Sequence, residues 1–510
     1  MNTTFISNKF VSGVIAAAIK NVIEMDTRFS MLLSKSGFAF NKHQFNGVRW
    51  CVNNEKRVFT NTNTNTNTNI RGGIIADEMG LGKTLLMIGT MFTNFLPKTI
   101  IIVPPILLHQ WAKEIYKCSG HNALIYHGPA KKNISFSQLS DKKVCIVLTT
   151  YNTLLPLKNK HSVISDLLRI QWDRAVFDEA HHLRNSNTSR FNWCKKILAP
   201  IRWLISGTPI QNRRADFYSL CNMLGFDKGF YKTKDNENIS YIIQHHVLRR
   251  TKAQVGIELP PVNKTDIVVP WQNVGEKLLS QEFHSLISKQ SGVSLDKAKD
   301  AAYTIYDKYD NKGTIMLLSM LRAKQSCVLP ALIKKSLNSC ILEDKTGIYL
   351  DAVSSSSKLD AVIKKILDRK DNGKGKIVFC NFCEEIDAIA LRLRAGGVSK
   401  VVTYDGRQKK RTFDKADVII LQIQTGCEGL NLQEFFSEIY FVSPHWNPAI
   451  EDQAIARCHR IGQKLDVDVF KFEMAGFDFN VNLDLESVSL DKYVNQVQAV
   501  KRDIAGSIIV

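Results

Sequence analysis

The chain lacks any long hydrophobic run. No stretch approaches the roughly 18 consecutive apolar residues that a membrane-spanning helix needs. The apolar segment "VSGVIAAAI" near the N-terminus is short and is followed by Lys20, Glu24 and Asp26. We interpret it as a buried helical segment rather than a secretory signal. We therefore expect an intracellular protein without a membrane partner.

A disulfide framework is also missing. The 11 cysteines are an odd number and are scattered along the chain, which argues against structural disulfides. Cys380 and Cys383 have the spacing Cys-x-x-Cys, but neither a second such pair nor a histidine pair accompanies them. We therefore expect a strand cysteine and its neighbour there, and no zinc site.

Acidic residues are few compared with basic ones. The chain has 68 Lys and Arg against 48 Asp and Glu, which gives a formal net charge of +20 and an isoelectric point near 9.4. Such an excess favours a polyanionic partner, and nucleic acid is the first candidate. Charge alone does not identify the partner, because many basic proteins bind no polyanion specifically.

Short apolar runs alternate with longer amphipathic stretches in both halves of the chain. The runs are "TIIIVPP", "VCIVLTTY", "RAVFDEAHH" and "RWLISGTP" in the first half, and "KIVFCNF", "KVVTYDG", "DVIILQIQTG", "EIYFVSPH" and "VDVFKFEMAG" in the second. Continuous apolar runs are typical of strands buried on both faces of a parallel sheet. The segments between them are long enough for crossover helices. We predict an α/β fold with two parallel-sheet lobes.

Three further regions differ from this alternation. Residues from about 262 to 350 have helical periodicity without strand alternation, so we predict helical protrusions and a linker there. The serine run "AVSSSSK" at 352–358 is a candidate flexible joint. The tract "TNTNTNTNTN" at 60–69 has no apolar residue to bury and is predicted to be a disordered surface loop.

The segment "IIADEMGLGKTLL" at 74–86 has the features of a phosphate-binding loop. The strict pattern Gly-x-x-x-x-Gly-Lys-Ser/Thr ends correctly at Gly82, Lys83 and Thr84, but Asp77 stands where its first glycine belongs. A short strand, a loop with Gly80 and an apolar helix place backbone N–H groups and the helix dipole toward phosphate. Lys83 would reach the β- and γ-phosphates, and Thr84 could bind Mg²⁺. A glycine-rich turn without a ligand is the alternative.

A second fragment supplies the carboxylates that such a site needs. In "AVFDEAHH", Asp178 could hold Mg²⁺ and Glu179 could orient or deprotonate an attacking water. Both fragments fall at strand ends within one α/β pattern, which is harder to obtain by chance than either fragment alone. The adjacent His181 and His182 lack a further ligand at helical spacing, so they do not predict a metal site.

The order of four motifs resembles a known family. "DEMGLGKT", "DEAHH", "SGTPIQN" and "QAIARCHRIGQ" resemble the helicase motifs of superfamily two, specifically its Swi/Snf-type branch of double-stranded DNA translocases. Members of this branch typically carry Asp at the position of Asp77. The resemblance covers the chain from about Phe38 to its end and implies two RecA-like lobes with ATP and Mg²⁺ as cofactors. We therefore divide the chain into 1–37 (N-terminal helical segment), 38–261 (first lobe), 262–350 (protrusions and linker), 351–475 (second lobe) and 476–510 (C-terminal brace).

The resemblance assigns residues to the nucleotide. "HQFNGVRW" is similar to the adenine-recognising segment and makes Gln44 a candidate for the base. Asp77, Gly80 and Gly82 belong to the phosphate loop, and Gly429 is expected near the nucleotide. In the last motif, Gln453, Arg457 and Arg460 follow, and the arginines are expected to act as arginine fingers. Their spacing predicts that all three lie on one helix face, although surface ion pairs of little energetic value would have the same spacing.

The resemblance also implies contacts to DNA. The candidates are Thr149, Thr150, Arg184, Asn381, Thr425 and Gly426. The family's longer tract before "DVIILQIQTG" is reduced here to "RQKKRTFDKADV". The final segment "SLDKYVNQVQAVKRDIAGSII" resembles the family's brace helix, and a simple amphipathic packing helix explains it equally well.

The predicted function is ATP-dependent translocation on double-stranded DNA, which would remodel protein–DNA complexes or assist transcription. Nucleosomes and transcription proteins are the candidate protein partners of what we expect to be a monomeric motor. The compact chain also resembles the global transactivator proteins of insect DNA viruses, which implies a viral protein acting in the host nucleus. Two alternatives remain open: a DEAH-type helicase that unwinds RNA or DNA, and a scaffold with a degenerate ATPase core.

Overall fold

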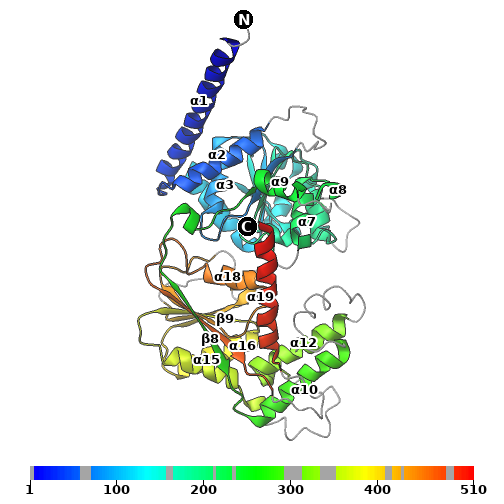
Figure 1. Cartoon of the computed structure of the whole chain (residues 1–510), viewed down its shortest axis with the longest axis vertical. Coiled ribbons are helices and arrows are strands. Elements are labelled where there is room, and N and C mark those ends of the chain that lie inside the picture. Colours follow the sequence, from blue (N-terminus) through cyan, green and yellow to red (C-terminus); the bar gives the residue numbers. More distant parts are fainter. Residues whose placement is uncertain are drawn as a thin grey trace. The chain divides into compact units, whose positions relative to one another are not determined.

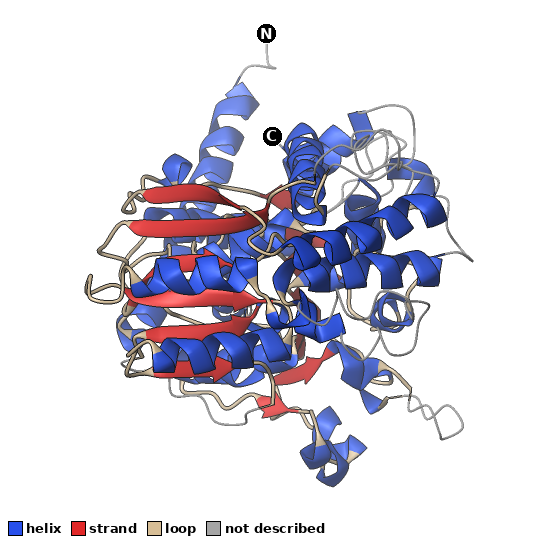
Figure 2. Ribbon diagram, turned by 90° about the horizontal axis from the view of Figure 1, so that it is seen from below, coloured by secondary structure: helices blue, strands red, loops and turns tan. Residues whose placement is uncertain are grey.

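The computed structural model describes residues 5–57, 70–156, 165–210, 214–231, 237–291, 313–333, 352–407, 416–426, 430–477 and 488–509. Apart from the last two residues, contacts divide the chain into two compact units, Met1–Glu258 and Leu259–Ile508. Each unit contains one sheet flanked by helices (Figures 1 and 2). We describe the two units separately.

The first unit contains a seven-stranded sheet with the order β3-β4-β2-β5-β6-β1-β7. Every neighbouring pair of strands is parallel. The strands are β1 (Arg71–Ile75), β2 (Thr99–Val103), β3 (Leu124–Ile125), β4 (Ile146–Thr150), β5 (Arg174–Asp178), β6 (Ile201–Ile205) and β7 (Val247–Leu248). Strands β2, β4 and β5 are buried along their whole length. This burial on both faces explains why their sequences are continuous apolar runs.

Four helices form the main core of the first unit with this sheet. They are α1 (Phe5–Ser36), α2 (Lys42–Lys56), α3 (Lys83–Thr93) and α4 (Leu108–Ser119). Phe29, Val48 and Trp111 from these helices pack in one cluster with Trp203 of β6. Helix α1 approaches α3 so closely that a Cβ atom on Gly89 would lie 2.4 Å from the Phe29 ring. Glycine is therefore required at this contact.

Shorter helices complete the first unit. They are α5 (Phe136–Ser140), α6 (Ser189–Lys195), α7 (Arg214–Leu224), α8 (Lys228–Tyr231) and α9 (Glu237–His246), with 3-10 turns at Pro105–Leu107, Pro129–Asn133, Tyr151–Leu154, Asp166–Leu168, Ala180–Leu183 and Ala253–Val255. None of the described helices combines the length and the apolar content required to cross a bilayer.

The second unit contains a six-stranded sheet with the order β10-β11-β9-β12-β13-β8. All of its neighbouring strands are parallel. The elements are β8 (Val262–Val269), β9 (Gly375–Cys380), β10 (Val401–Tyr404), β11 (Val418–Gln422), β12 (Phe436–Phe441) and β13 (Val467–Met474), with α10 (Val274–Ser291), α12 (Gly313–Val328), α15 (Ser357–Leu367), α16 (Cys383–Ala395), α17 (Ile423–Gly426), α18 (Pro448–Ile455) and α19 (Leu490–Ile509), and a 3-10 turn at Pro330–Ile333. The prediction of an α/β fold with two parallel-sheet lobes is confirmed.

The expectation of only helices and a linker from residue 262 onward is wrong at its start. Strand β8 pairs with β13 over its full length, from Val262 beside Val467 to Val269 beside Met474. The residues of β8 between Asn263 and Asp266 are exposed, so this edge strand has no continuous apolar run for sequence analysis to detect.

The serine run at 352–358 is not a flexible joint. Ser355 and Ser357 donate hydrogen bonds through their hydroxyl groups to the buried Glu276 carboxylate, at 2.6 and 2.5 Å. The next residue, Lys358, is fully buried and pairs with Asp491. Serine hydroxyls and a lysine therefore tie the start of α15 to α10 and α19.

The predicted C-terminal helix is α19, and it packs within the second unit. Tyr493, Val494 and Val497 share a core cluster with Ile287 of α10 and Ala323 of α12. Further along α19, the side chain of Gln498 donates to the His445 carbonyl at 2.5 Å and to the Glu451 carboxylate at 2.6 Å. The helix is thus held by apolar and polar contacts. The tracts at 60–69 and 408–415 and the predicted linker at 334–351 lie outside the described residues.

A buried charged network fixes α2 against the first sheet. Arg174 donates to both carboxylate oxygens of Glu55, at 2.6 and 2.7 Å. Trp203 and Asn94 donate to the same carboxylate at 2.8 and 2.7 Å. Both Glu55 and Arg174 are almost completely buried, so each charge depends on the other for compensation.

We predict that Glu55→Gln lowers the free energy of unfolding of the first unit by about 3 to 5 kcal/mol, because it leaves the Arg174 guanidinium buried without a counter-charge. Urea unfolding followed by circular dichroism measures this loss. The matched control is Glu24→Gln, which breaks an exposed pair with Arg28 and should cost under about 1 kcal/mol. Equal effects of the two changes would contradict the role assigned to the buried network.

Candidate functional site

Three adjacent strands of the first unit end at the same level. Ile205 of β6 pairs with Ile75 of β1 on one side and with Asp178 of β5 on the other. The N–H of Ser206 then donates to the Ile75 carbonyl at 3.0 Å. Because parallel strands share the direction of their carboxyl ends, the segments that follow β1, β5 and β6 meet at one edge.

The segment after β1 forms a glycine-dependent loop. Gly80 and Gly82 have φ angles of 91° and 78°, which residues with a side chain rarely adopt. Lys83 begins α3, and its Nζ donates to the Asp77 carbonyl at 2.9 Å. A Cβ atom on Gly207, which follows β6, would lie 3.3 Å from the same Nζ. The lysine thus stands between the loop and the segment after β6, at a helix N-terminus suited to phosphate.

Gln44 of α2 lies against this loop. A Cβ atom on Gly82 would come within 2.5 Å of the Gln44 Nε2 atom, so the loop glycine also makes room for this amide. Gln44 is buried, and its Oε1 has no hydrogen-bond partner among the described residues. An unsatisfied buried acceptor at the phosphate loop fits a ligand that carries an N–H donor.

Asp77, which we predicted to contact the nucleotide, does not face a ligand. Its side chain is completely buried, and the Arg250 guanidinium binds both of its carboxylate oxygens at 3.0 and 2.5 Å. The prediction that Asp77 is a cofactor-binding residue is therefore wrong for a direct contact. A buried aspartate requires a counter-charge, and the segment that follows β7 provides it.

Asp178 lies at the end of β5 and is held by two hydrogen bonds. Trp111 of α4 donates its Nε1–H to one carboxylate oxygen at 2.7 Å, and the N–H of Glu179 donates to the other at 2.9 Å. Burial, followed by the negative charge of Glu179, raises the pKa of Asp178 to about 7. The Trp111 bond and the nearby Lys83 ammonium act in the opposite direction.

Glu179 has an unusual backbone conformation. Among the described residues it is the non-glycine residue with a positive φ, at φ 50° and ψ 50°. Such a conformation costs about 1 to 2 kcal/mol for an L-residue and is typical of functional sites. One carboxylate oxygen of Glu179 lies 3.2 Å from Nδ1 of His181. The Tyr151 hydroxyl donates a hydrogen bond to the Asp178 carbonyl at 2.6 Å. This bond stabilises the backbone directly before Glu179.

Two predicted DNA ligands have internal partners instead. Thr149 and Thr150 are completely buried at the end of β4. The Thr149 hydroxyl donates to the Tyr126 carbonyl at 2.9 Å, and the Thr150 hydroxyl lies 2.8 Å from that of Thr153. The structure thus contradicts a direct phosphate contact from these hydroxyls. Arg184, at the end of the turn after Glu179, is exposed.

In the second unit, the three predicted residues of the last motif do not share one helix face. Helix α18 ends at Ile455, so it contains Gln453 but neither Arg457 nor Arg460. The chain turns there because Arg457 N donates to the Ala454 carbonyl at 3.2 Å and Leu432 N donates to the Arg457 carbonyl at 3.1 Å. The Gln453 Nε2 and Arg457 Nε atoms are buried donors without a partner among the described residues.

The remaining predicted residues of the second unit differ in their surroundings. Arg460 donates to the Asn431 side chain. The Asn381 side chain accepts a hydrogen bond from the Lys324 ammonium at 3.1 Å. Gly426 ends α17 directly after Thr425, whose side chain is outside the described part. Gly429 also lies outside the described residues.

Sequence analysis missed three residues that shape the first unit's site. Trp111 binds the side-chain carboxylate of Asp178, and Tyr151 binds its main-chain carbonyl. Arg250 binds the Asp77 carboxylate. Asp77 stands where a loop glycine belongs, and a buried aspartate requires a basic partner. That substitution was the signal from which a partner such as Arg250 could have been predicted. Nothing in the sequence pointed to Trp111 or Tyr151 in particular.

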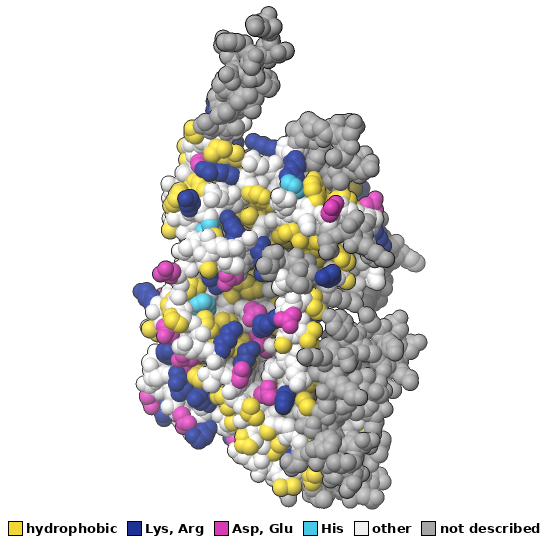
Figure 3. Space-filling model, in the orientation of Figure 1, with side chains coloured by type: hydrophobic (Ala, Val, Ile, Leu, Met, Phe, Trp, Pro, Cys, Tyr) yellow, Lys and Arg dark blue, Asp and Glu magenta, His cyan; other side chains and the backbone are white. Residues whose placement is uncertain are grey.

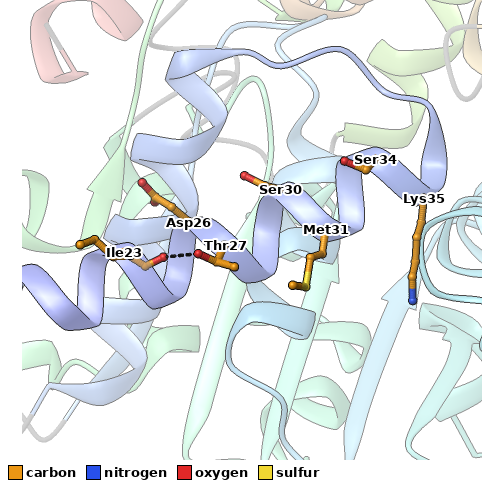
Figure 4. A pocket seen from close by; sticks show the side chains of 7 residues that line it. All are labelled: Ile23, Asp26, Thr27, Ser30, Met31, Ser34 and Lys35. Carbon is orange, nitrogen blue, oxygen red and sulfur yellow. Dashed lines mark hydrogen bonds between the residues drawn. The ribbon is translucent and has the colours of Figure 1, made fainter.

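A hollow on α1 is separate from this site. Its lining residues, between Ile23 and Lys35, all belong to α1 (Figure 4). The Thr27 hydroxyl donates to the Ile23 carbonyl at 2.8 Å within it. No residue of the phosphate loop or of the acid pair lines this hollow, so it is not the predicted nucleotide site.

Comparison with family models tests whether the chain belongs to the family that its motifs resemble. The model "SNF2-related domain" matches residues 43–332, and "Helicase conserved C-terminal domain" matches residues 357–462. The chain belongs to the SNF2-related family. As a member of this family, it is an ATP-hydrolysing, helicase-like enzyme.

Individual relatives of this SNF2-related chain differ in length. The "Probable global transactivator" of Orgyia pseudotsugata multicapsid polyhedrosis virus is 30% identical over 84% of this chain and 85% of the viral protein. The "Uncharacterized ATP-dependent helicase" of Mycoplasma genitalium is 28% identical over 92% of this chain, which spans only 42% of that helicase. A solved "Sulfolobus solfataricus SWI2/SNF2 ATPase core in complex with dsDNA" is 24% identical over 92% of this chain and 93% of that chain, with a TM-score of 0.38.

The Trp111 hydrogen bond predicts a shift in the pH dependence of ATP hydrolysis. With its pKa raised to about 7, Asp178 loses its carboxylate form as the pH falls through that value. Trp111→Phe removes a hydrogen bond that lowers this pKa, so the acid limb of the kcat/KM profile should move to higher pH. Steady-state hydrolysis from about pH 6 to about pH 9 measures the limb.

The control for this prediction is Trp172→Phe. Trp172 is also completely buried in the first unit, and its Nε1–H donates at 2.9 Å to the Leu167 carbonyl, away from Asp178. This variant loses the same indole group and should keep the wild-type acid limb. If Trp111→Phe kept it as well, the hydrogen bond would not control the protonation of Asp178.

Proposed function

We propose that the chain is an ATP-dependent translocase on double-stranded DNA that remodels protein–DNA complexes or assists transcription. The observation that carries the proposal is the single sheet edge at which Lys83, Asp178 and Glu179 meet, in a chain of the SNF2-related family. Lysine at a helix N-terminus and two acids at a strand end are the parts that phosphoryl transfer requires.

The residues at this edge fit ATP and Mg²⁺. The unpartnered Gln44 Oε1 fits an N–H donor of the base, and the Gly80–Gly82 backbone fits phosphate. Thr84 and Asp178 would hold Mg²⁺, which would neutralise phosphate charge when bound. Lys83 then offsets the charge of the β- and γ-phosphates, and Glu179 orients the attacking water. Glu179 has the left-handed backbone conformation that is typical of functional sites.

The second unit supplies further proposed nucleotide ligands. Arg457 and Arg460 are proposed to stabilise charge on the γ-phosphate, and Gln453 is proposed to act beside them. Support comes from Gln453 Nε2 and Arg457 Nε, since buried donors without a partner fit an oxygen-rich ligand. Gly429 remains a proposed nucleotide neighbour.

Duplex DNA is the proposed track. The net charge of +20 favours a polyanion. On the face drawn in Figure 3, basic side chains are mixed with acidic ones, so the support from charge is the net excess of the whole chain and not a basic patch on this face. Arg184, Asn381, Thr425 and Gly426 are the proposed contacts, whereas Thr149 and Thr150 would position the neighbouring backbone.

The proposed place of action is the nucleus, and a host nucleus if the protein is viral. The support is the similarity to a viral global transactivator over most of both chains. Nucleosomes or transcription proteins would be the complexes acted upon by a monomeric motor. The rival is a DEAH-type unwinding helicase, for which "DEAHH" is the supporting feature.

We predict that duplex DNA stimulates ATP hydrolysis more than single-stranded DNA or RNA does, and that Lys83→Ala reduces the stimulated rate by roughly 100-fold or more, since the lysine acts on charge that develops in the transition state. Phosphate release with each nucleic acid measures both effects. Added salt should weaken the stimulation steeply.

Lys228→Ala is the matched control, because Lys228 is an exposed lysine of the same unit. It should leave the stimulated rate unchanged. Stronger stimulation by RNA would favour the unwinding helicase. A wild-type rate of ATP hydrolysis in the Lys83→Ala protein would contradict the assignment of residues 74–86 as a phosphate-binding loop.

Translocation itself predicts the displacement of a third strand from a DNA triplex. The wild-type chain should release a labelled third strand from a duplex in the presence of ATP and leave the two duplex strands paired. A gel assay with and without ATP measures both outcomes. ATP hydrolysis without displacement would contradict the motor, and separation of the duplex strands would favour the rival.

A further inference from the structure

The backbone after β7 runs beside the phosphate loop. The Ala76 N–H donates to the Leu248 carbonyl at 2.7 Å, and the Glu78 N–H donates to the Arg250 carbonyl at 2.9 Å. These bonds continue the pairing of β1 with β7 beyond both strands. Arg250 therefore has a fixed position next to Asp77, although the two residues are far apart in the sequence.

The Arg250 side chain joins two segments. Its Nε and Nη2 atoms bind the Asp77 carboxylate, while Nη1 donates to the His43 carbonyl in the first turn of α2. A Cβ atom on Gly47 would lie 3.0 Å from Nη2, so α2 itself leaves room for the guanidinium. The planar fork of arginine makes this double contact, which a lysine ammonium cannot reproduce.

The turn of α2 that Arg250 holds is also tied to the loop by its own side chain. Nε2 of His43 lies 3.2 Å from the Leu81 carbonyl. The next residue, Gln44, rests on Gly82, with its Oε1 buried and unpartnered. The position of the His43 main chain thus determines how far the Gln44 side-chain amide lies from the phosphate loop.

We propose that the Asp77–Arg250 ion pair determines the base selectivity of the nucleotide site by fixing Gln44 through the His43 carbonyl. The inference rests on the proposed role of Gln44 toward the base. Adenine presents an N–H donor beside a ring-nitrogen acceptor, which complements a correctly oriented amide, whereas guanine presents an oxygen acceptor in place of the donor. Asp77 and Arg250 are positioning residues in this arrangement, because neither touches the nucleotide.

The test is the ratio of kcat/KM for ATP to kcat/KM for GTP. This ratio is measured on the same protein preparation, so a loss of folded protein cancels. Arg250→Lys keeps a charge for Asp77 but loses the bridge to His43, and it should lower the ratio by about tenfold, the equivalent of one charge-assisted hydrogen bond. Asp77→Asn should lower it in the same direction.

Matched controls come from a second bidentate pair that also holds α2. Arg49 binds both carboxylate oxygens of Asp26, on α1. Arg49→Lys and Asp26→Asn make the same chemical changes away from Gln44 and should leave the ratio within about twofold of wild type. If Asp77→Asn does not fold, Arg250→Lys with its Arg49→Lys control still decides the question.

A double-variant comparison identifies Gln44 as the target. Gln44→Ala should lower the ratio by itself, and Arg250→Lys should then cause no further fall. The proposal is overturned if Arg250→Lys leaves the ratio unchanged, if Gln44→Ala leaves it unchanged, or if the two effects multiply. A loss of DNA stimulation with intact selectivity would instead count against the translocase function and leave this inference standing.

Discussion

The candidate site depends on β6 lying in parallel register between β1 and β5. Because Ile205 pairs with both Ile75 and Asp178, the phosphate loop, the acid pair and the segment at Ser206 leave the sheet at one level. No local stretch of sequence could bring the Lys83 ammonium within electrostatic range of Asp178. The chemistry is therefore a property of the completed sheet, and its long-range strand pairing must form before the site exists.

Buried charge then determines how other segments attach to the two sheets. Asp77 with Arg250, Glu55 with Arg174, and Lys358 with Asp491 each join residues that are distant in the sequence and largely buried. Removing one member of such a pair is costly because the other charge stays buried. In the first unit two of these pairs hold α2 at its beginning and its end, so the helix that carries Gln44 has little freedom. In the second unit the third pair anchors the start of α19.

Sequence analysis found the nine strands that have apolar runs and the short strand β1 before the phosphate loop, and it missed three others for physical reasons. β3 and β7 are only short pairings, and β8 is an exposed edge strand whose polar residues match no buried pattern. Lys83, Asp178 and Glu179 were predictable because their spacing to a loop or a strand end is local. Arg250, Trp111 and Tyr151 were not, since their partners are set by tertiary contacts. The predicted contacts of Thr149 and Thr150 failed because their strand is buried on both faces.

Asp178 is contacted by the segments that follow two neighbouring strands. Trp111 follows β2 and binds the carboxylate, while Tyr151 follows β4 and binds the carbonyl of the same residue. Tyr151 directly follows Thr149 and Thr150, the predicted DNA ligands of β4. Under the proposed function, one hydrogen bond would therefore separate the nucleic-acid side from the acid that serves the nucleotide. A change in the charge of Asp178 alters the strength of the Trp111 bond directly, because a carboxylate accepts more strongly than a carboxylic acid. The coupling that a motor requires would then need no long relay through the sheet.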